Sequence, residues 1–204
     1  MNRRSFLRNS ALMSAGLAFP GMLSFIEYRR AHARQQPLRA AFSSGGLAGT
    51  WNAQGQEAAL YMADLLGVEI TWFDGEFNPS VQRNKVDQMA TEQWDFVAIQ
   101  PGSIDVLIEP VTTMINNGIP FIDMDVLVAP LGQLPEMGVL TFIAPDNVFM
   151  SESVVKKLVE KMEGAGKIFH IGGEPGHTGA QARRQGFYNI VNQYPDLSLI
   201  HISE

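Results

Sequence analysis

The chain has 204 residues, of which 46% are hydrophobic and 18% charged, and this ordinary globular composition excludes a disordered or fibrous protein. It contains no cysteine, so disulfides, cysteine-ligated zinc, a thiol nucleophile and a lipid-modified cysteine are excluded. The formal net charge of −6 argues against a general nucleic-acid-binding protein, because such proteins need a basic face.

Residues 1–33 have the three-part layout of a bacterial export signal. Two adjacent arginines precede an apolar segment at residues 11–26, and a small-x-small cleavage site follows at residues 31–33. The arginine pair followed by Ser-Phe-Leu-Arg resembles a twin-arginine signal, whose cargo is often exported already folded. An N-terminal membrane anchor is the alternative, but the apolar run is short for a span and contains Pro20.

Strand and helix patterns alternate after this segment. Short apolar runs with β-branched and aromatic residues predict strands, and apolar residues at helical spacing predict helices. This alternation predicts right-handed β-α-β units and an α/β fold with a Rossmann-like parallel sheet covered by helices on both faces. The expected strands are residues 38–43, 68–73, 96–99, 118–125 and 139–144, and the expected helices are residues 51–66, 79–89 and 104–116.

A second, incomplete α/β lobe is predicted to follow. Its expected helices are residues 149–162 and 178–194, and its expected strands are residues 167–171 and 197–202. The predicted domains are a signal peptide at 1–33, an N-terminal α/β lobe at 38–147 and the start of a second lobe at 148–204. Such a partial lobe should expose apolar faces that it cannot cover.

The strand at residues 118–125 ends on a carboxylate, Asp125. Ligands of open parallel sheets bind beyond the carboxyl ends of the strands, where Asp125 can accept hydrogen bonds from ligand hydroxyl or amine groups. The alternative is that Asp125 caps the following turn. The loops at 44–50, 74–78 and 100–103 should share this edge of the sheet, so we expect any ligand to bind there.

Four stretches give the chain a specific resemblance: residues 94–101, 117–125, 144–147 and the Arg-x-x-Gly-Phe motif at 183–187. In this order and on these elements, they resemble a type I periplasmic substrate-binding protein of the ribose/galactose-binding kind, the soluble receptor of an ABC sugar importer. The resemblance covers about residues 38–197. It implies two Rossmann-like lobes that close on a sugar around a hinge.

The resemblance also implies ligand-binding residues. Asp125 and Arg183 align with family residues that hydrogen-bond sugar hydroxyls. Thr50 and Trp51 lie near contact positions of the first lobe, and the Trp51 ring could stack on the C–H face of a pyranose. Gln100, in the turn after the third strand, is the fifth candidate ligand-binding residue.

Two of these candidates, Trp51 and Arg183, have a structural alternative. Trp51 opens a helix and could pack on the core, and Arg183 could be a solvated neighbour of Arg184. Where ribose-type members have an arginine after the aspartate, this chain has Val126, which argues against ribose as the ligand.

Sequence patterns for other chemistry are lacking. His170 and His177 bracket a glycine turn without a further ligand pattern at metal spacing, so no metal site is expected. The glycines at 45–49 do not form a nucleotide-binding fingerprint, and no catalytic set is recognisable. We therefore expect no cofactor and no catalytic residue, and the protein is not expected to be an enzyme.

The expected function is that of an exported, periplasmic solute-binding protein that captures a sugar or polyol between two lobes for an ABC importer. Its expected partners are this small molecule and an ABC permease, with no nucleic acid, and the complete protein is expected to be a monomer. The alternative is an extracytoplasmic sugar-sensing domain of a signalling receptor. A DNA-binding repressor of the same fold is disfavoured by the export signal.

The last residues bear on the length of the protein. The family continues well past residue 204, and residues 198–204 resemble a translated sequencing-adapter tail. We therefore expect a C-terminally truncated chain that binds ligand poorly and tends to aggregate.

Overall fold

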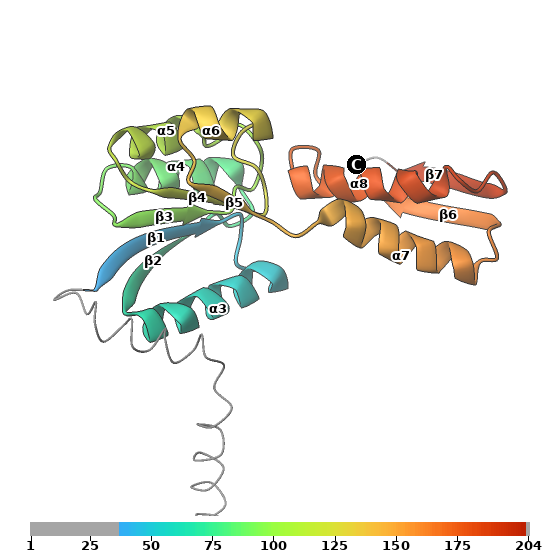
Figure 1. The fold of residues 1–204 in the computed structure, drawn as a ribbon, viewed down its shortest axis with the longest axis horizontal. Helices are drawn as coiled ribbons and strands as arrows, with labels where there is room; N and C mark the ends of the chain where they lie inside the picture. The colour runs from blue at the N-terminus through green and yellow to red at the C-terminus, as the bar shows by residue number, and fades with distance from the viewer. Residues whose placement is uncertain (1–36, 203–204) are drawn as a thin grey trace, which may run out of the picture. The chain divides into compact units, whose positions relative to one another are not determined.

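The computed structural model describes residues 37–202 and contains a five-stranded parallel sheet (Figure 1). The strand order is β2-β1-β3-β4-β5, so the chain starts near the middle, moves to one edge and returns to build the other side. This is the predicted α/β parallel sheet. The strands are β1 (Leu38–Ser44), β2 (Val68–Asp74), β3 (Phe96–Ile99), β4 (Phe121–Met124) and β5 (Thr141–Ile143).

Helices lie on both faces of this sheet, as the sequence predicts. In Figure 1, α4 (Pro79–Met89), α5 (Ile108–Asn116) and α6 (Leu134–Met137) lie on one face, and α3 (Thr50–Leu66) lies on the other. A short 3-10 helix, η1 (Leu131–Gln133), precedes α6. The predicted export signal, residues 1–33, lies outside the described residues. Within residues 37–202, no helix combines the length and the apolarity needed to cross a bilayer.

Local signals explain where α4 begins and where α3 ends. The side chain of Asn78 accepts hydrogen bonds from the N–H groups of Ser80 and Val81, and Pro79 occupies the first turn of α4, where its missing N–H costs nothing. Helix α3 ends at Gly67, whose φ of 67° is a left-handed conformation that glycine adopts without strain.

The main hydrophobic core lies between the sheet and the three helices α4, α5 and α6 that cover one of its faces. Its fully buried side chains come from the central strands and from the inward faces of these helices. Phe121 of β4 is the largest of them. Other members of the core are Val86, Met89, Val97, Ile99, Leu107, Val111, Met114 and Val128.

Some predicted boundaries are wrong by several residues. Helix α5 begins at Ile108 rather than at residue 104, because backbone N–H groups before it form hydrogen bonds with residues outside the helix. The N–H of Ile104 donates to the carbonyl oxygen of Gly176 at 3.0 Å, and the N–H of Asp105 donates to that of Val128 at 3.1 Å. Asp105 also has a φ of 72°, which a right-handed helix cannot contain.

The strand predicted at residues 118–125 is shorter than expected and spans Phe121–Met124. Pro120 precedes this strand, while its carbonyl oxygen accepts a hydrogen bond from the N–H of Val97. At the other end, Asp125 leaves the extended conformation with a φ of 60°. The fifth strand, predicted at residues 139–144, is likewise shorter and spans Thr141–Ile143.

A second α/β unit follows with its own sheet and its own core. It contains α7 (Asn147–Lys161), β6 (Gly166–Ile171), α8 (Thr178–Val191) and β7 (Leu197–Ile202), with β6 and β7 paired in parallel. Its buried apolar side chains are Val155, Val159, Ile168, Phe187 and Val191.

Close packing of α7 against α8 depends on Gly186. A Cβ at this position would collide with the backbone carbonyl oxygen of Val148, so a larger residue would force the helices apart. The expected exposed apolar face is also present, since Phe169 and Ile171 of β6 are exposed to solvent. Helix α8 ends at Val191, three residues before its predicted end.

Candidate functional site

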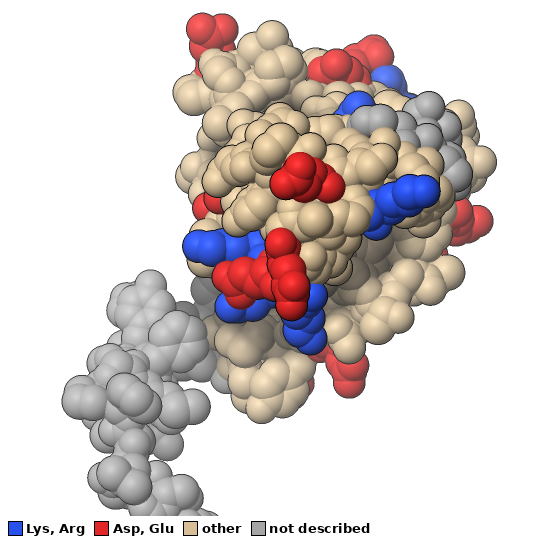
Figure 2. Space-filling model, turned by 90° about the vertical axis from the view of Figure 1, so that its right-hand side faces the viewer, with Lys and Arg blue, Asp and Glu red and all other residues tan. Residues whose placement is uncertain are grey.

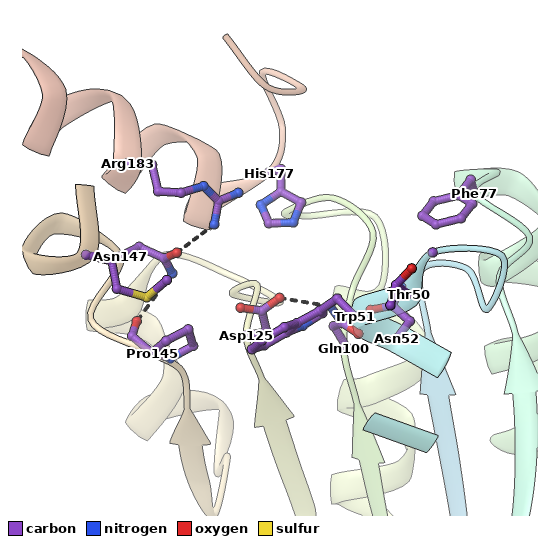
Figure 3. A pocket seen from close by; sticks show the side chains of 12 residues that line it. Thr50, Trp51, Asn52, Phe77, Gln100, Asp125, Pro145, Asn147, His177 and Arg183 are labelled. Atoms are coloured by element: carbon purple, nitrogen blue, oxygen red, sulfur yellow. Dashed lines mark hydrogen bonds between the residues drawn. The ribbon is translucent and has the colours of Figure 1, made fainter. Parts of the chain in front are cut away.

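A pocket of about 410 Å³ opens beyond the carboxyl ends of the strands in the five-stranded sheet (Figure 3). All five residues singled out from the sequence line it. Thr50 and Trp51 come from the start of α3, Gln100 from the turn after β3, Asp125 from the end of β4 and Arg183 from α8. The structure therefore brings together residues that are up to 133 positions apart in the chain (183 − 50).

Asp125 presents its carboxylate through an unusual backbone conformation. Its φ of 60° lies in the left-handed region, which aspartate tolerates better than most residues, and its N–H donates to the carbonyl oxygen of Ile143 at 2.8 Å. The carboxylate Oδ2 accepts a hydrogen bond from Gln100 Nε2 at 2.8 Å. The alternative role for Asp125 was to cap the turn after β4. In the structure the N–H of Val128, in that turn, donates to the carboxylate of Asp123 instead.

The turn that carries Gln100 is itself held by a buried glutamine of α4. Gln82 Nε2 donates to the carbonyl oxygen of Gln100 at 2.9 Å and to the hydroxyl of Ser43 at 3.2 Å. Gln82 Oε1 accepts from the N–H of Gly102 at 2.8 Å. One side chain thus connects the carboxyl ends of β1 and β3 and fixes the position from which Gln100 reaches Asp125.

Two exposed aromatic rings line the pocket. Trp51 is 63% exposed and Phe77 is 61% exposed, so neither ring is buried in the core. The alternative that Trp51 packs on the core is therefore wrong. An exposed aromatic face in a pocket is suited to stacking on an apolar face of a ligand. Phe77 was not anticipated from the sequence.

The glycine loop between β1 and α3 makes room for Phe77. A Cβ on Gly46 would lie 2.5 Å from the Phe77 ring, and one on Gly49 would lie 2.9 Å from it. The loop is fastened by Asn52, whose Nδ2 donates to the carbonyl oxygen of Gly46 at 2.7 Å. The small residues at 45–49 therefore serve close packing against an aromatic ring.

Arg183 reaches the pocket from the second α/β unit. Its Nη1 donates to Asn147 Oδ1 at 2.6 Å, and Asn147 Nδ2 donates to the carbonyl oxygen of Pro145 at 3.3 Å (Figure 3). Asn147 is only 6% exposed and begins α7. The Arg183 side chain is exposed to solvent, and this hydrogen bond orients it at the pocket.

His177 is a second lining residue that sequence reasoning did not place in the site. It precedes α8, and its Nδ1 accepts a hydrogen bond from the N–H of Ala180 at 3.2 Å. In the neutral ring the proton is therefore on Nε2, which leaves a donor available. Figure 3 shows His177 and Arg183 on the side of the pocket opposite Asp125 and Trp51.

The local signals for these additional residues were weak. Asn147 is the first residue of α7 and His177 is the N-cap of α8, and nothing in the sequence indicates which residue at a helix start also faces a pocket. Within residues 37–202, no cluster of three histidine, cysteine, aspartate or glutamate side chains is arranged to hold a metal ion.

Two hydrogen bonds donated by backbone N–H groups connect the site loops to the second unit. The N–H of Leu127, two residues after Asp125, donates to Thr178 Oγ1 at 3.0 Å. The N–H of Ile104 donates to the carbonyl oxygen of Gly176. The loops after β3 and β4 therefore meet the turn before α8 beside the pocket.

A second pocket of about 600 Å³ adjoins the first and shares five lining residues with it: Trp51, Asn52, Gln100, Asp125 and Pro145. Its additional lining is largely apolar and includes Trp72, Met124 and Ile143. The first pocket is the better candidate for a polar ligand, because only it combines Asp125 with Arg183, Asn147 and His177.

The first pocket therefore offers a carboxylate, a guanidinium, carboxamides and an imidazole around two aromatic faces. Such a set can exchange several hydrogen bonds with a neutral ligand rich in hydroxyl groups, each of which can both donate and accept. The aromatic rings can cover its C–H groups.

Comparison with known families identifies the family of the chain. The model of the periplasmic binding protein domain matches residues 40–204. The chain therefore belongs to this family, whose members and structural neighbours are binding proteins rather than enzymes. The fold prediction and the resemblance stated from the sequence are confirmed.

Three relatives illustrate the similarity. The xylitol-binding protein of Mycolicibacterium smegmatis is 22% identical over 147 residues, which are 72% of this chain and 40% of the relative. An ABC transporter solute-binding protein from Agrobacterium vitis, solved with α-D-tagatopyranose, is 24% identical with a TM-score of 0.73, covering 80% of this chain and 57% of that one. The fructose-binding periplasmic domain of a hybrid two-component system is also 24% identical, with a TM-score of 0.69 and coverages of 80% and 52%. The chain thus spans about half the length of these proteins.

Proposed function

We propose that this protein is an exported solute-binding protein that captures a sugar or polyol between two lobes and delivers it to an ABC permease. The observation that carries the proposal is the convergence of Asp125, Arg183 and Trp51 on one pocket. The pairing of Asp125 with Gln100 and of Arg183 with Asn147 holds both charged groups in place. Membership of the periplasmic binding protein family supports a location outside the cytoplasm.

The proposed lobes are residues 38–147 and residues 148–204. The ligand would contact Asp125, Gln100, Thr50 and Trp51 from the first lobe and Arg183 from the second. A ligand that bridges both lobes stabilises the closed arrangement by the contacts that exist only there. Residues 1–33 would direct export by the twin-arginine route, and the complete receptor would act as a monomer.

The charge distribution supports a small-molecule ligand over a nucleic acid. On the face drawn in Figure 2, lysine and arginine side chains lie among acidic ones, and most of the surface carries neither. The net charge of −6 would repel a polyanion.

A sugar-sensing domain of a signalling receptor is a second candidate. The similarity to the periplasmic domain of a hybrid two-component system favours it, because that domain binds fructose with the same fold. The two candidates share the pocket and differ in the partner, which is a permease in one case and a signalling protein in the other.

Calorimetric titration of the full chain with xylitol, allitol, D-tagatose, D-fructose and L-arabinose tests the proposal. We expect weak but saturable binding of at least one of these compounds, because the chain spans only about half the length of its relatives, and the Trp51→Ala variant should weaken it further. Tyr61→Ala is the matched control, because Tyr61 is an equally exposed aromatic residue of α3 outside the pocket. The absence of binding across this panel and a wider set of sugars and polyols would contradict the proposal.

A further inference from the structure

Asp123 is a buried carboxylate directly beneath the binding site. It lies on β4 two residues before Asp125 and has no exposed surface. Because side chains alternate along a strand, it shares the core-facing side of β4 with Phe121. Its Oδ2 accepts a hydrogen bond from the N–H of Val128 at 3.0 Å. Its Oδ1 is the one buried side-chain nitrogen or oxygen atom within residues 37–202 that lacks a hydrogen-bond partner.

The loop that Asp123 closes, residues 125–128, makes three connections. The N–H of Asp125 binds the end of β5 through Ile143. The N–H of Leu127 donates to Thr178 Oγ1 in the second unit, and the carbonyl oxygen of Val128 accepts from the N–H of Asp105. The loop therefore carries one pocket side chain and one direct link to the second unit.

We propose that Asp123 is a positioning residue for the ligand site. Its carboxyl group holds the loop at residues 125–128 so that Asp125 faces the pocket and the Leu127 N–H reaches Thr178. It does not touch the ligand. The part of this inference that concerns ligand affinity rests on the proposed function.

A purely structural role does not explain a carboxyl group at this position. An apolar side chain of similar size would fill the same space without burying an unpaired oxygen, whose desolvation is unfavourable. Burial also raises the pKa of Asp123 to about 7, against a smaller lowering by the backbone N–H groups of Val128 and Met124. A group that is unfavourable for folding but holds a binding loop is typical of functional sites.

Three variants separate positioning from core packing. Asp123→Val removes the acceptor and the unpaired oxygen together. Asp123→Asn keeps a side-chain oxygen for the Val128 N–H. Thr178→Val removes the acceptor of Leu127 at the other end of the same chain of contacts.

Amide hydrogen exchange of the full chain is the first readout, because it needs no ligand. We expect Asp123→Val to speed exchange at Leu127 and Val128 roughly tenfold. Exchange rates in the rest of the sheet should be unchanged or slower, and the melting temperature should be unchanged or higher. Asp123→Asn should exchange like the original chain. An Asp123→Val variant that exchanges normally in this loop, or that melts lower and exchanges faster throughout the sheet, would overturn the proposal.

Titration with a compound that the original chain binds, chosen from xylitol, allitol and D-tagatose, is the second readout. We expect Asp123→Val to weaken binding roughly fivefold or more, and its effect and that of Thr178→Val should not add in the double variant. Unchanged affinity in Asp123→Val would overturn the positioning role. If the original chain binds none of the probes, the proposed function fails, while the exchange measurement still decides whether Asp123 holds the loop.

Discussion

Gln100 Nε2 donates a hydrogen bond of 2.8 Å to Asp125 Oδ2, across the gap between the carboxyl ends of β3 and β4. These strands are neighbours in the sheet, with Ile99 paired to Asp123, so their end residues must meet. The bond uses one lone pair of one carboxylate oxygen and leaves the other oxygen available to a ligand. Asp125 is therefore the first residue to test.

Asp125→Asn should weaken ligand binding by about 1.5–3 kcal/mol, or roughly 10- to 150-fold in Kd, because hydrogen bonds to a charged group are the strong ones. Asparagine also tolerates a positive φ, so the backbone should not change. Asp105→Asn is the matched control, since Asp105 has a φ of 72° and lies outside the pocket lining. Calorimetry on both variants makes the comparison, and equal affinities would exclude Asp125 from the site.

Arg183→Gln should weaken binding roughly tenfold or more, because it removes the cation that the second unit contributes to the pocket. Arg184→Gln removes the same charge one residue away, where the guanidinium lies 5.7 Å from the centre of the Tyr188 ring. The Arg184 variant should bind like the original chain. Equal losses in both variants would point to a general charge effect.

The Trp51 ring should report ligand binding by its fluorescence, because it is 63% exposed and lines the pocket. Trp51→Ala should abolish the ligand-dependent part of the signal and cost about 0.5–1.5 kcal/mol of binding free energy, the range of aromatic stacking. A signal that survives in Trp51→Ala would have to come from Trp72 or Trp94 and would count against stacking on Trp51.

The stability of the fold should fall as the pH rises from about 4 to about 7. The pKa of Asp123 is raised from 3.8 to about 7, so in this window the folded chain binds more protons than the unfolded chain, and the free energy of unfolding decreases with pH. This rise in the pKa corresponds to a loss of about 4 kcal/mol in the free energy of unfolding once Asp123 is ionised. Asp123→Asn should remove this part of the pH dependence in denaturant titrations at pH 4.5, 6 and 8.

The control for that experiment is Asp64→Asn, which removes one exposed carboxylate of α3. If the two substitutions change the pH dependence equally, the effect comes from net charge and not from burial of Asp123.

Gly46→Ala should destabilise the chain by about 1–3 kcal/mol, the usual cost of overpacking, because the new methyl group would lie 2.5 Å from the Phe77 ring. It should also weaken ligand binding by moving Phe77. Gly55→Ala is the opposite case, since a Cβ there meets open space in the middle of α3, and it should stabilise by roughly 0.5–1 kcal/mol. Thermal melts test this contrast: the melting temperature should fall in Gly46→Ala and rise in Gly55→Ala.

Much of the fold could be predicted because each strand and helix carries a local signal. The helix from Pro79 to Met89 has a cap and a first-turn proline, and the strand from Phe96 to Ile99 is a short buried apolar run. The early end of β4 could not be predicted, because the φ of 60° at Asp125 depends on its N–H reaching Ile143, eighteen residues later (143 − 125). Long-range partners of this kind leave no local pattern.

The candidate site divides in the same way. Asp125 and Arg183 were predicted because they occupy recognisable motifs, and both line the pocket. Phe77, Asn147 and Asp123 were missed, because their roles depend on contacts with Gly46, Arg183 and Val128. Asp123 in particular looked like an ordinary member of the strand.

The two carboxamides that hold the charged groups have a thermodynamic consequence. Gln100 fixes Asp125, and Asn147 fixes Arg183, before any ligand arrives. Freezing rotamer-rich side chains on binding costs about 0.5–1.5 kcal/mol each, and here that loss of entropy has already occurred during folding. Neutral amides also leave both charges unneutralised. A hydroxyl-rich ligand would therefore meet groups that are already ordered and still fully polar, which favours discrimination among stereoisomers that differ only in the direction of one hydroxyl.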